Sequence, residues 1–177
     1  MRGRYHAKRT YGLGANFSLL RLLAFPVRGS VVTRVYKRPE SVLVVIYTVT
    51  GEVLLLERRQ PAGYWQSVTG SLEWGESAQA AALREVREET GLDVSDVLVD
   101  CGYANRFEII PAWRTRYAPD IQTNTEYVFR AECPHKPAVG INPAEHSRYQ
   151  WLSRREALQR VSSGTNREAI VHFVTAE

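Results

Sequence analysis

The stretch 70–92 constrains the fold of this chain most strongly, because it joins a glycine-rich loop to a segment with the features of a capped α-helix. Ser77 can cap a helix over 78–90, and the Ala, Leu, Arg and Glu residues of that segment are strong helix formers. Gly91 suits the left-handed position that ends many helices. The glycines of the loop 70–75 allow a sharp turn and a close approach of the backbone to a phosphate. The sequence therefore predicts a loop that can receive a phosphate, followed directly by a helix.

Three glutamates of this helix, Glu85, Glu88 and Glu89, are neighbours because an α-helix has about 3.6 residues per turn. Like charges at these spacings destabilise a helix by about a few tenths of a kcal/mol per pair. A bound hard cation turns this repulsion into attraction, and Mg²⁺ prefers oxygen ligands of this kind. Taken alone, the cluster could also be a solvated acidic face paired with Arg84 and Arg87.

The spacing of nine residues resembles the signature of the Nudix hydrolases, G-x5-E-x7-R-E-U-x-E-E-x-G-U, in which U is a bulky apolar residue. Members of this family cleave a nucleoside diphosphate that is linked to another moiety. The resemblance implies an α+β fold, with a mixed β-sheet sandwiched between α-helices. The matching residues are Gly70, Glu76, Arg84, Glu85, Val86, Glu88, Glu89, Gly91 and Leu92.

Flanking segments extend this resemblance from about Tyr36 to the C-terminus. The run YWQSVTGS is more specific to one branch of the family than the signature itself. They are similar to a bacterial branch of the family that hydrolyses 7,8-dihydroneopterin triphosphate to its monophosphate and pyrophosphate in folate biosynthesis. A housekeeping pyrophosphohydrolase for dATP or oxidised purine nucleoside triphosphates is the alternative, because purine and pterin rings are alike in shape. A catalytically inactive Nudix module that binds a nucleotide is a further class, but such proteins typically lose signature glutamates.

The resemblance implies Mg²⁺ as cofactor, with Mn²⁺ as a substitute, and it implies catalytic roles for the glutamates of the helix. Glu85 and Glu89 are the expected metal ligands, and Glu88 is a further ligand or the base that activates water. The third ligand is expected outside the signature at Glu145, with Glu126 as its rival. Adjacent His146 has no second histidine at ligand spacing, so a surface or packing role is expected for it.

Supporting and substrate-binding roles follow from the same resemblance. Gly70, Glu76 and Arg84 are expected to shape the loop and orient the glutamates. Basic side chains can neutralise phosphates, hydroxyls can donate hydrogen bonds, Phe107 offers a face to a bicyclic ring, and Glu108 could accept from its amino and N–H groups. The expected substrate contacts are Lys37, Arg58, Thr69, Phe107, Glu108, Ile109, Ile110 and Ser163.

The net charge of +4 is unevenly distributed, because residues 1–39 hold nine Lys or Arg and no acid. The remainder holds 14 basic and 19 acidic residues. We expect a basic, poorly ordered extension at 1–34 and a single Nudix domain at 35–177. Arg21 interrupts the apolar run 17–27, which falls short of the roughly 20 residues of a membrane span. No membrane or nucleic-acid partner is therefore expected. The resemblance implies a small-molecule pterin or nucleoside triphosphate as the partner, and the oligomeric state stays open.

Cys101 and Cys133 lie far apart and form no CxxC pair, which argues against a zinc or redox motif and favours a reducing, cytoplasmic location.

Strand patterns are strong at 41–50 and 52–57, and a tight turn at Thr50 and Gly51 predicts an antiparallel hairpin between them. The rest of the chain mixes strands and helices without the alternation of a doubly wound sheet. The other predicted elements are strands at 67–68, 94–101, 103–110, 123–132 and 149–152, an irregular loop at 113–120, and helices at 155–160 and 166–175.

Overall fold

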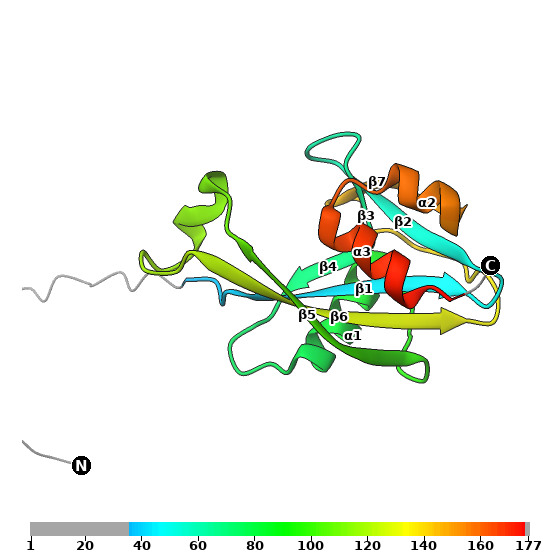
Figure 1. Cartoon of the computed structure of the whole chain (residues 1–177), viewed down its shortest axis with the longest axis horizontal. Coiled ribbons are helices and arrows are strands. Elements are labelled where there is room, and N and C mark those ends of the chain that lie inside the picture. The colour runs from blue at the N-terminus through cyan, green and yellow to red at the C-terminus, as the bar shows by residue number, and fades with distance from the viewer. Residues whose placement is uncertain (1–35, 176–177) are drawn as a thin grey trace, which may run out of the picture. The chain divides into compact units, whose positions relative to one another are not determined.

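The computed structural model describes residues 36–175, so the predicted extension at 1–34 lies outside the described residues. Within them, strands of one sheet alternate irregularly with helices (Figure 1). The strands are β1 (Glu40–Thr48), β2 (Glu52–Arg58), β3 (Trp65–Gln66), β4 (Val68–Ser71), β5 (Leu98–Glu108), β6 (Thr123–Cys133) and β7 (His146–Ser153). The helices are α1 (Ala78–Thr90), the 3-10 helix η1 (Pro111–Arg116), α2 (Arg154–Arg160) and α3 (Gly164–Phe173).

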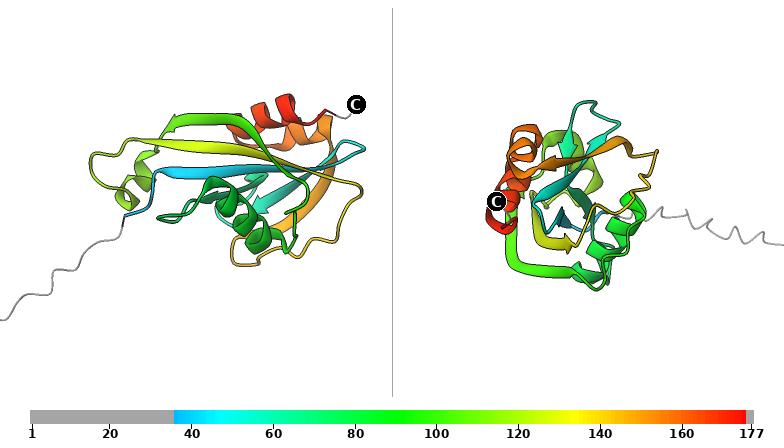
Figure 2. Two further views of the ribbon diagram at one scale, coloured as in Figure 1. Left: turned by 90° about the horizontal axis from the view of Figure 1, so that it is seen from below. Right: turned by 90° about the vertical axis from the view of Figure 1, so that its right-hand side faces the viewer.

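The sheet is mixed, as the sequence predicts. Its main path runs β3-β2-β1-β6-β5, while β4 pairs with β1 and β7 pairs with β2. β1 pairs with β6 in parallel along the whole length of β1, from Glu40↔Thr125 to Thr48↔Cys133, and the other pairs are antiparallel. Helix α1 covers one face of this sheet, and α2 and α3 cover the other (Figure 2).

The hydrophobic core lies on both faces of β1, which explains the unbroken apolar run of that strand. Val42, Val44 and Ile46 pack in a cluster with buried alanines and a valine of α1. Leu43 and Val45 point to the opposite face and pack in a second cluster with α3. The side chains of a strand alternate between faces, so residue parity decides which helix layer each position meets.

The structure confirms the helix predicted at 78–90 together with both of its caps. The Ser77 side chain accepts a hydrogen bond from the Ala80 amide, and Gly91 ends the helix in the left-handed conformation with φ of 69°. Ala82 and Val86 are buried against the sheet. The cap residues and the apolar side of the helix therefore fix where α1 begins, where it ends and how it is rotated.

The predicted hairpin forms only in part. Residues 49–51 make the turn, but the registered pair between β1 and β2 lies at its base, Tyr47↔Val53. The edge of β1 that a hairpin partner would occupy instead pairs with β4, from Ser41 to Val44. Strand β2 pairs along its length with β7. The antiparallel ribbon is therefore replaced by a branch point in the sheet.

The two strands predicted at 94–101 and 103–110 are one strand, β5. Its pairing with β6 shifts register between Asp100 and Tyr103, where Gly102 has a positive φ of 62°. Such an interruption of the pairing within one strand is a β-bulge. In the sequence, a bulge can look like the end of one strand and the start of another.

The bounds of other elements also differ from their predictions, and β7 begins at His146, three residues before the predicted strand. The 3-10 helix η1 lies at 111–116, where an irregular loop was expected from 113. Helix α3 begins at Gly164, two residues before its predicted start, because the Ser163 side chain caps it. None of the helices among residues 36–175 combines the length and apolar character that a bilayer crossing requires.

Candidate active site

Glu85 projects from α1 directly against β4. A Cβ atom built on Gly70 would lie 1.8 Å from the Glu85 Cδ atom, so no other residue type fits at this position without moving the carboxylate. The φ of Gly70 is not in the left-handed region, so the glycine is required by this close approach rather than by its own backbone conformation. Helix and strand therefore hold the Glu85 side chain between them.

Arg84 connects the loop to the carboxylates of α1. Its Nε and Nη2 atoms each donate to the Glu76 carboxylate at 2.9 Å, and Nη2 also donates to the Ser71 carbonyl at 3.0 Å. Its Nη1 atom lies 2.8 Å from Glu85 Oε1 and 3.3 Å from Glu88 Oε2. The guanidinium thus contacts three signature glutamates and the end of β4, and it lowers the pKa of Glu76. Glu76 and Arg84 contact each other as supporting residues would, and their role stays a prediction.

Glu89 is buried at the end of α1, with 1% of its surface exposed. Its Oε2 atom lies 3.1 Å from Nε2 of His146, which is equally buried, but Oε2 has no hydrogen-bond partner among the described residues. Oxygen and nitrogen ligand atoms of Glu89, Glu145 and His146 lie within 4.8 Å of one another, a group that could hold a metal ion. Burial raises the pKa of Glu89, since its charge is poorly solvated.

The donor set of this region suits a divalent cation. The pKa of Glu85 is raised to about 7, mainly by burial and also by the charges of Glu89 and Glu88, while Arg84 opposes the shift. Carboxylates this close together are difficult to ionise without a counter-charge. The buried carboxylate of Glu89, beside that of Glu145, offers oxygen ligands of the kind that a hard cation prefers.

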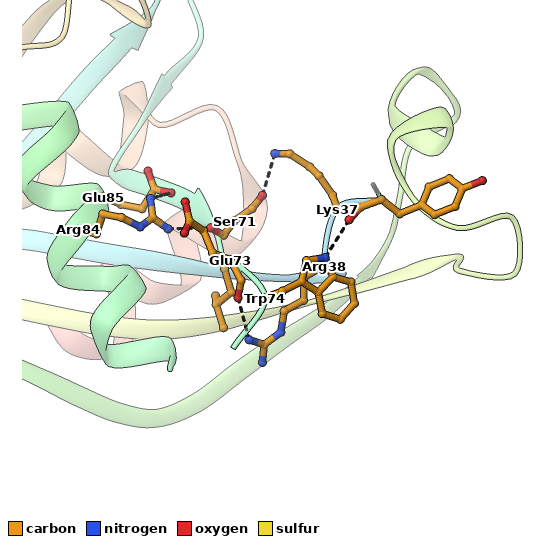
Figure 3. Close-up of a pocket in the computed structure, with 9 residues that line it drawn as sticks. Lys37, Arg38, Ser71, Glu73, Trp74, Arg84 and Glu85 are labelled. Atoms are coloured by element: carbon orange, nitrogen blue, oxygen red, sulfur yellow. Dashed lines mark hydrogen bonds and ion pairs between the residues drawn. The ribbon is translucent and has the colours of Figure 1, made fainter. Parts of the chain in front are cut away.

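Basic side chains face these carboxylates. Lys37 Nζ donates to Ser71 Oγ at 3.0 Å (Figure 3). Burial lowers the pKa of Lys37, and the charges of Arg116 and Arg58 lower it further, while Glu85 and Glu145 oppose this shift. A cavity of about 500 Å³ opens here, lined by residues that include Lys37, Ser71 and Glu85. Two predicted phosphate contacts, Lys37 and Arg58, therefore lie within electrostatic reach of the predicted metal ligands.

The other predicted substrate contacts are more dispersed. Thr69 is half-buried on β4 and accepts a hydrogen bond from Gln66 Nε2 at 3.0 Å. The Ser163 hydroxyl caps α3. In the run 107–110, Phe107 is half-buried and Glu108 exposed at the end of β5, Ile109 is buried, and Ile110 is exposed before η1.

The structure separates the two carboxylates that compete for the role of third metal ligand. Glu145 lies beside Glu89, whereas Glu126 lies on β6 and accepts a hydrogen bond from Asn105 Nδ2 at 3.0 Å. The parity of β6 directs Glu126 to the face that α3 covers, because its neighbour Val128 packs in the α3 cluster. Glu145 is thus the member of this pair that could join Glu89 on one ion.

Sequence reasoning did not foresee how closely His146 and Asn142 approach this group. His146 is buried against Glu89, and the Asn142 side chain donates to Glu145 Oε1 at 3.2 Å. The amide of Asn142 also donates to the Glu89 carbonyl at 3.1 Å, which ties the loop to the end of α1. The adjacency of Glu145 and His146 in the sequence could have indicated that both lie at the site. It could not indicate that His146 is buried against Glu89.

The metal-free protein should lose stability as pH rises through the range in which Glu85 ionises. Its pKa of about 7 in the folded state lies above the ordinary value of 4.5, so the folded protein binds more protons between these limits. The resulting contribution to the free energy of unfolding is present at low pH and is lost as pH approaches and passes 7. In EDTA, the Tm of the wild type should fall more between pH 5 and pH 8 than that of Glu85→Gln, measured by calorimetry. Equal falls in both proteins would show that Glu85 is already ionised at pH 5.

Comparison with known proteins agrees with this arrangement. A family model described as the NUDIX domain matches residues 37–173. The dihydroneopterin triphosphate diphosphatase of Escherichia coli K12 is 46% identical over 145 residues, covering 80% of this chain and 95% of that protein. The enzyme of the same name from Haemophilus influenzae is 40% identical over 143 residues, covering 78% and 89% respectively.

Solved structures show the same relationship. A structure titled as the E. coli dihydroneopterin triphosphate pyrophosphohydrolase superposes with a TM-score of 0.72 at 46% identity, covering 79% of this chain and 97% of that one. A putative NUDIX hydrolase from Listeria monocytogenes superposes with a TM-score of 0.66 at 25% identity, covering 77% and 92%. With its signature carboxylates gathered on α1 against a mixed sheet, the chain belongs to the Nudix hydrolase family.

Proposed function

We propose that this protein hydrolyses 7,8-dihydroneopterin triphosphate to dihydroneopterin monophosphate and pyrophosphate, with Mg²⁺ as cofactor and Mn²⁺ as a substitute. The observation that carries the substrate is the 46% identity with the E. coli dihydroneopterin triphosphate diphosphatase along 95% of that protein. The retained signature glutamates and the cavity beside Lys37 support the same chemistry. A role in folate biosynthesis in the cytoplasm belongs to this proposal.

Glu85, Glu89 and Glu145 are the residues that we assign to the metal. A divalent cation bound there would neutralise phosphate oxygens and favour formation of a hydroxide nucleophile from water. Glu88, whose side chain is 53% exposed, faces outward from the cluster and is assigned as a further ligand or as the base that takes the proton from water. His146 packs against Glu89 and limits the positions that this carboxylate can take.

The remaining residues bind and orient the substrate. Lys37 and Arg58 supply positive charge for the phosphates, and charge-assisted hydrogen bonds of this kind are strong. Thr69 and Ser163 offer hydroxyl groups, and the run 107–110 is assigned to the side of the ring. Arg84 and Glu76 hold the loop and the glutamates in place, while Gly70 leaves room for Glu85. For hydrolysis, these contacts must hold the pyrophosphate leaving group in line with the attacking water.

Residues 35–177 are proposed as the catalytic domain, with 1–34 as an extension that catalysis does not need. The match of the family model, which begins at residue 37, supports this boundary. A chain that starts at Val35 should retain the turnover of the full chain, and loss of turnover in the shorter protein would refute the assignment.

Pyrophosphate release across a panel of triphosphates tests the proposed substrate. With Mg²⁺ present, kcat/KM should be highest for 7,8-dihydroneopterin triphosphate and lower for dATP, dGTP and 8-oxo-dGTP. Competition between dihydroneopterin triphosphate and dATP at equal concentrations measures the preference directly. A higher kcat/KM for any purine triphosphate would favour the housekeeping function instead.

A further inference from the structure

A row of polar side chains crosses four adjacent strands on the face of the sheet that carries α3. The registers pair Asn105 of β5 with Glu126 of β6, Glu126 with Ser41 of β1, and Ser41 with Ser71 of β4. Residues paired in register point to the same face, and their side chains contact one another across the strands. The Asn124 side chain, in the next position of this face, donates to Ser41 Oγ at 2.7 Å.

The row is buried at its β5–β6 end, although its members are polar. Glu126 and Asn105 are each 7% exposed, and burial raises the pKa of Glu126 while its hydrogen bonds to Asn105 and Thr165 oppose the shift. A carboxylate has about four lone-pair positions, so these partners leave room for further donors. Glu126 can therefore accept further hydrogen bonds from N–H groups.

Helix α3 adds an amide without its full set of partners to the same layer. Asn166 is 1% exposed, its Oδ1 accepts from Ser67 Oγ at 3.2 Å, and its Nδ2 has no hydrogen-bond partner among the described residues. It follows Thr165, which contacts Glu126. Thr165 and Asn166 thus place polar groups of α3 in the layer that carries Glu126.

The opposite end of the row reaches the candidate phosphate site. Ser71 accepts from Lys37 Nζ, lines the cavity beside Glu85, and follows Gly70 in β4 (Figure 3). Two strand spacings of about 4.8 Å each separate the backbone of Glu126 from that of Ser71, a distance of about 10 Å. A ligand with its phosphates near Lys37 could therefore place an attached ring over Ser41 and against Glu126.

Two helices lie near this row along the direction of the strands. Figure 1 shows α3 over the middle of β1 and β6, and η1 beyond the ends of β5 and β6 that carry this row. Ser41 and Phe107 are only half-buried here. The parity of β5 places Phe107 on the same face as Asn105, whereas Glu108 points to the opposite face. Glu126, rather than Glu108, is thus the acid that shares a face with Phe107.

We propose that Glu126 recognises the substrate ring by accepting hydrogen bonds from two adjacent donors, the 2-amino group and the N3–H group of a 2-amino-4-oxo ring. This inference rests on the proposed function and extends it to the ring atoms that Glu126 contacts. Dihydropterin presents this pair of donors, and guanine presents the same pair at its 2-amino group and its N1–H group. The corresponding edge of adenine has an amino donor next to a ring nitrogen that is an acceptor. One oxygen of the Glu126 carboxylate would therefore face the lone pair of that nitrogen, which is repulsive. Glu126 therefore selects 2-amino-4-oxo rings over adenine.

Replacement of Glu126 by glutamine tests the ring contact, because the amide keeps the shape and loses one acceptor. We expect kcat/KM for dihydroneopterin triphosphate and for dGTP to fall about 10- to 100-fold, the range of a bidentate base contact. The value for dATP should change by less than about three-fold, so the ratio of dGTP to dATP falls. Equal effects on all three substrates, or no effect on any, would overturn the assignment.

Glu132→Gln is the matched control. Glu132 lies on the same strand and the same face as Glu126 and accepts a hydrogen bond from Tyr47 Oη at 2.9 Å, at the far end of β6. This variant should leave the ratio of dGTP to dATP unchanged; if it lowers the ratio equally, the effect is not specific to Glu126. Turnover of dihydroneopterin triphosphate by the wild type tests the proposed function alone, whereas the ratio of the two nucleotides tests the ring contact alone.

Discussion

Glu89→Gln is expected to lower kcat by about a thousand-fold or more, because it removes a ligand charge from the centre of the proposed metal site. Metal stabilisation of phosphate oxygens contributes several kcal/mol to the transition state, and each 1.36 kcal/mol corresponds to about a tenfold change in rate. Glutamine keeps the size of the side chain in its buried position beside His146. The loss should therefore appear in turnover at saturating substrate, measured as pyrophosphate release.

Stability and metal binding separate this effect from a folding defect. Glutamine is close to glutamate in size, so we expect the variant to fold, and calorimetry of the metal-free protein measures any change in its Tm. Titration with Mn²⁺, followed by electron paramagnetic resonance, should show weaker binding to the variant than to the wild type. Turnover near the wild-type level would remove Glu89 from the metal site, whatever the binding data show.

Gly70→Ala is expected to produce the second largest loss, about a hundred-fold in kcat, through displacement of Glu85. The new methyl group would lie 1.8 Å from Glu85 Cδ, so the carboxylate must leave its position against β4. Small displacements of a reacting group can cost about a hundred-fold in rate. Steady-state assays at several Mg²⁺ concentrations should show that excess metal restores only part of the activity.

Gly140→Ala is the control for this substitution. A Cβ atom at Gly140 meets nothing within 4 Å, and its φ does not lie in the left-handed region. This variant should retain the turnover and the Tm of the wild type. If Gly70→Ala is equally silent, Glu85 is not held where the structure places it, or its position does not matter for catalysis.

Local features of the sequence predict the helix that carries the site well. Ser77 and Gly91 fix its ends through capping contacts that involve residues only three or four positions away. The apolar run at 41–50 likewise predicts a strand, and the structure shows β1 there, buried on both faces. Such features depend on neighbouring residues in the chain, so they can be read without knowledge of the rest of the fold.

Features that depend on distant residues were predicted less well. The sequence predicts that β1 and β2 pair along their length, but most of that edge of β1 pairs with β4 instead. The bulge at Gly102 made one strand look like two. The close contact between Glu89 and His146 joins residues far apart in the sequence, and their burial depends on the loop that returns between β6 and β7.

The face on which Glu126 lies could not be decided from the sequence for a related reason. A strand residue alternates between faces, and a shift of one position in register reverses every assignment. Only the pairing of Glu126 with Ser41 and Asn105 places it across the sheet from α1 and apart from the Glu89–Glu145 group.

A crystal structure with Mg²⁺ and a non-hydrolysable triphosphate analogue is the most direct test of the central claim, that the α1 carboxylates and Glu145 hold a cation that binds the phosphates. We expect Mg²⁺ to be coordinated by oxygens of Glu85, Glu89 and Glu145, and to contact phosphate oxygens beside Lys37. A structure with Mg²⁺ and the triphosphate bound elsewhere, and with these carboxylates free of metal, would contradict the account.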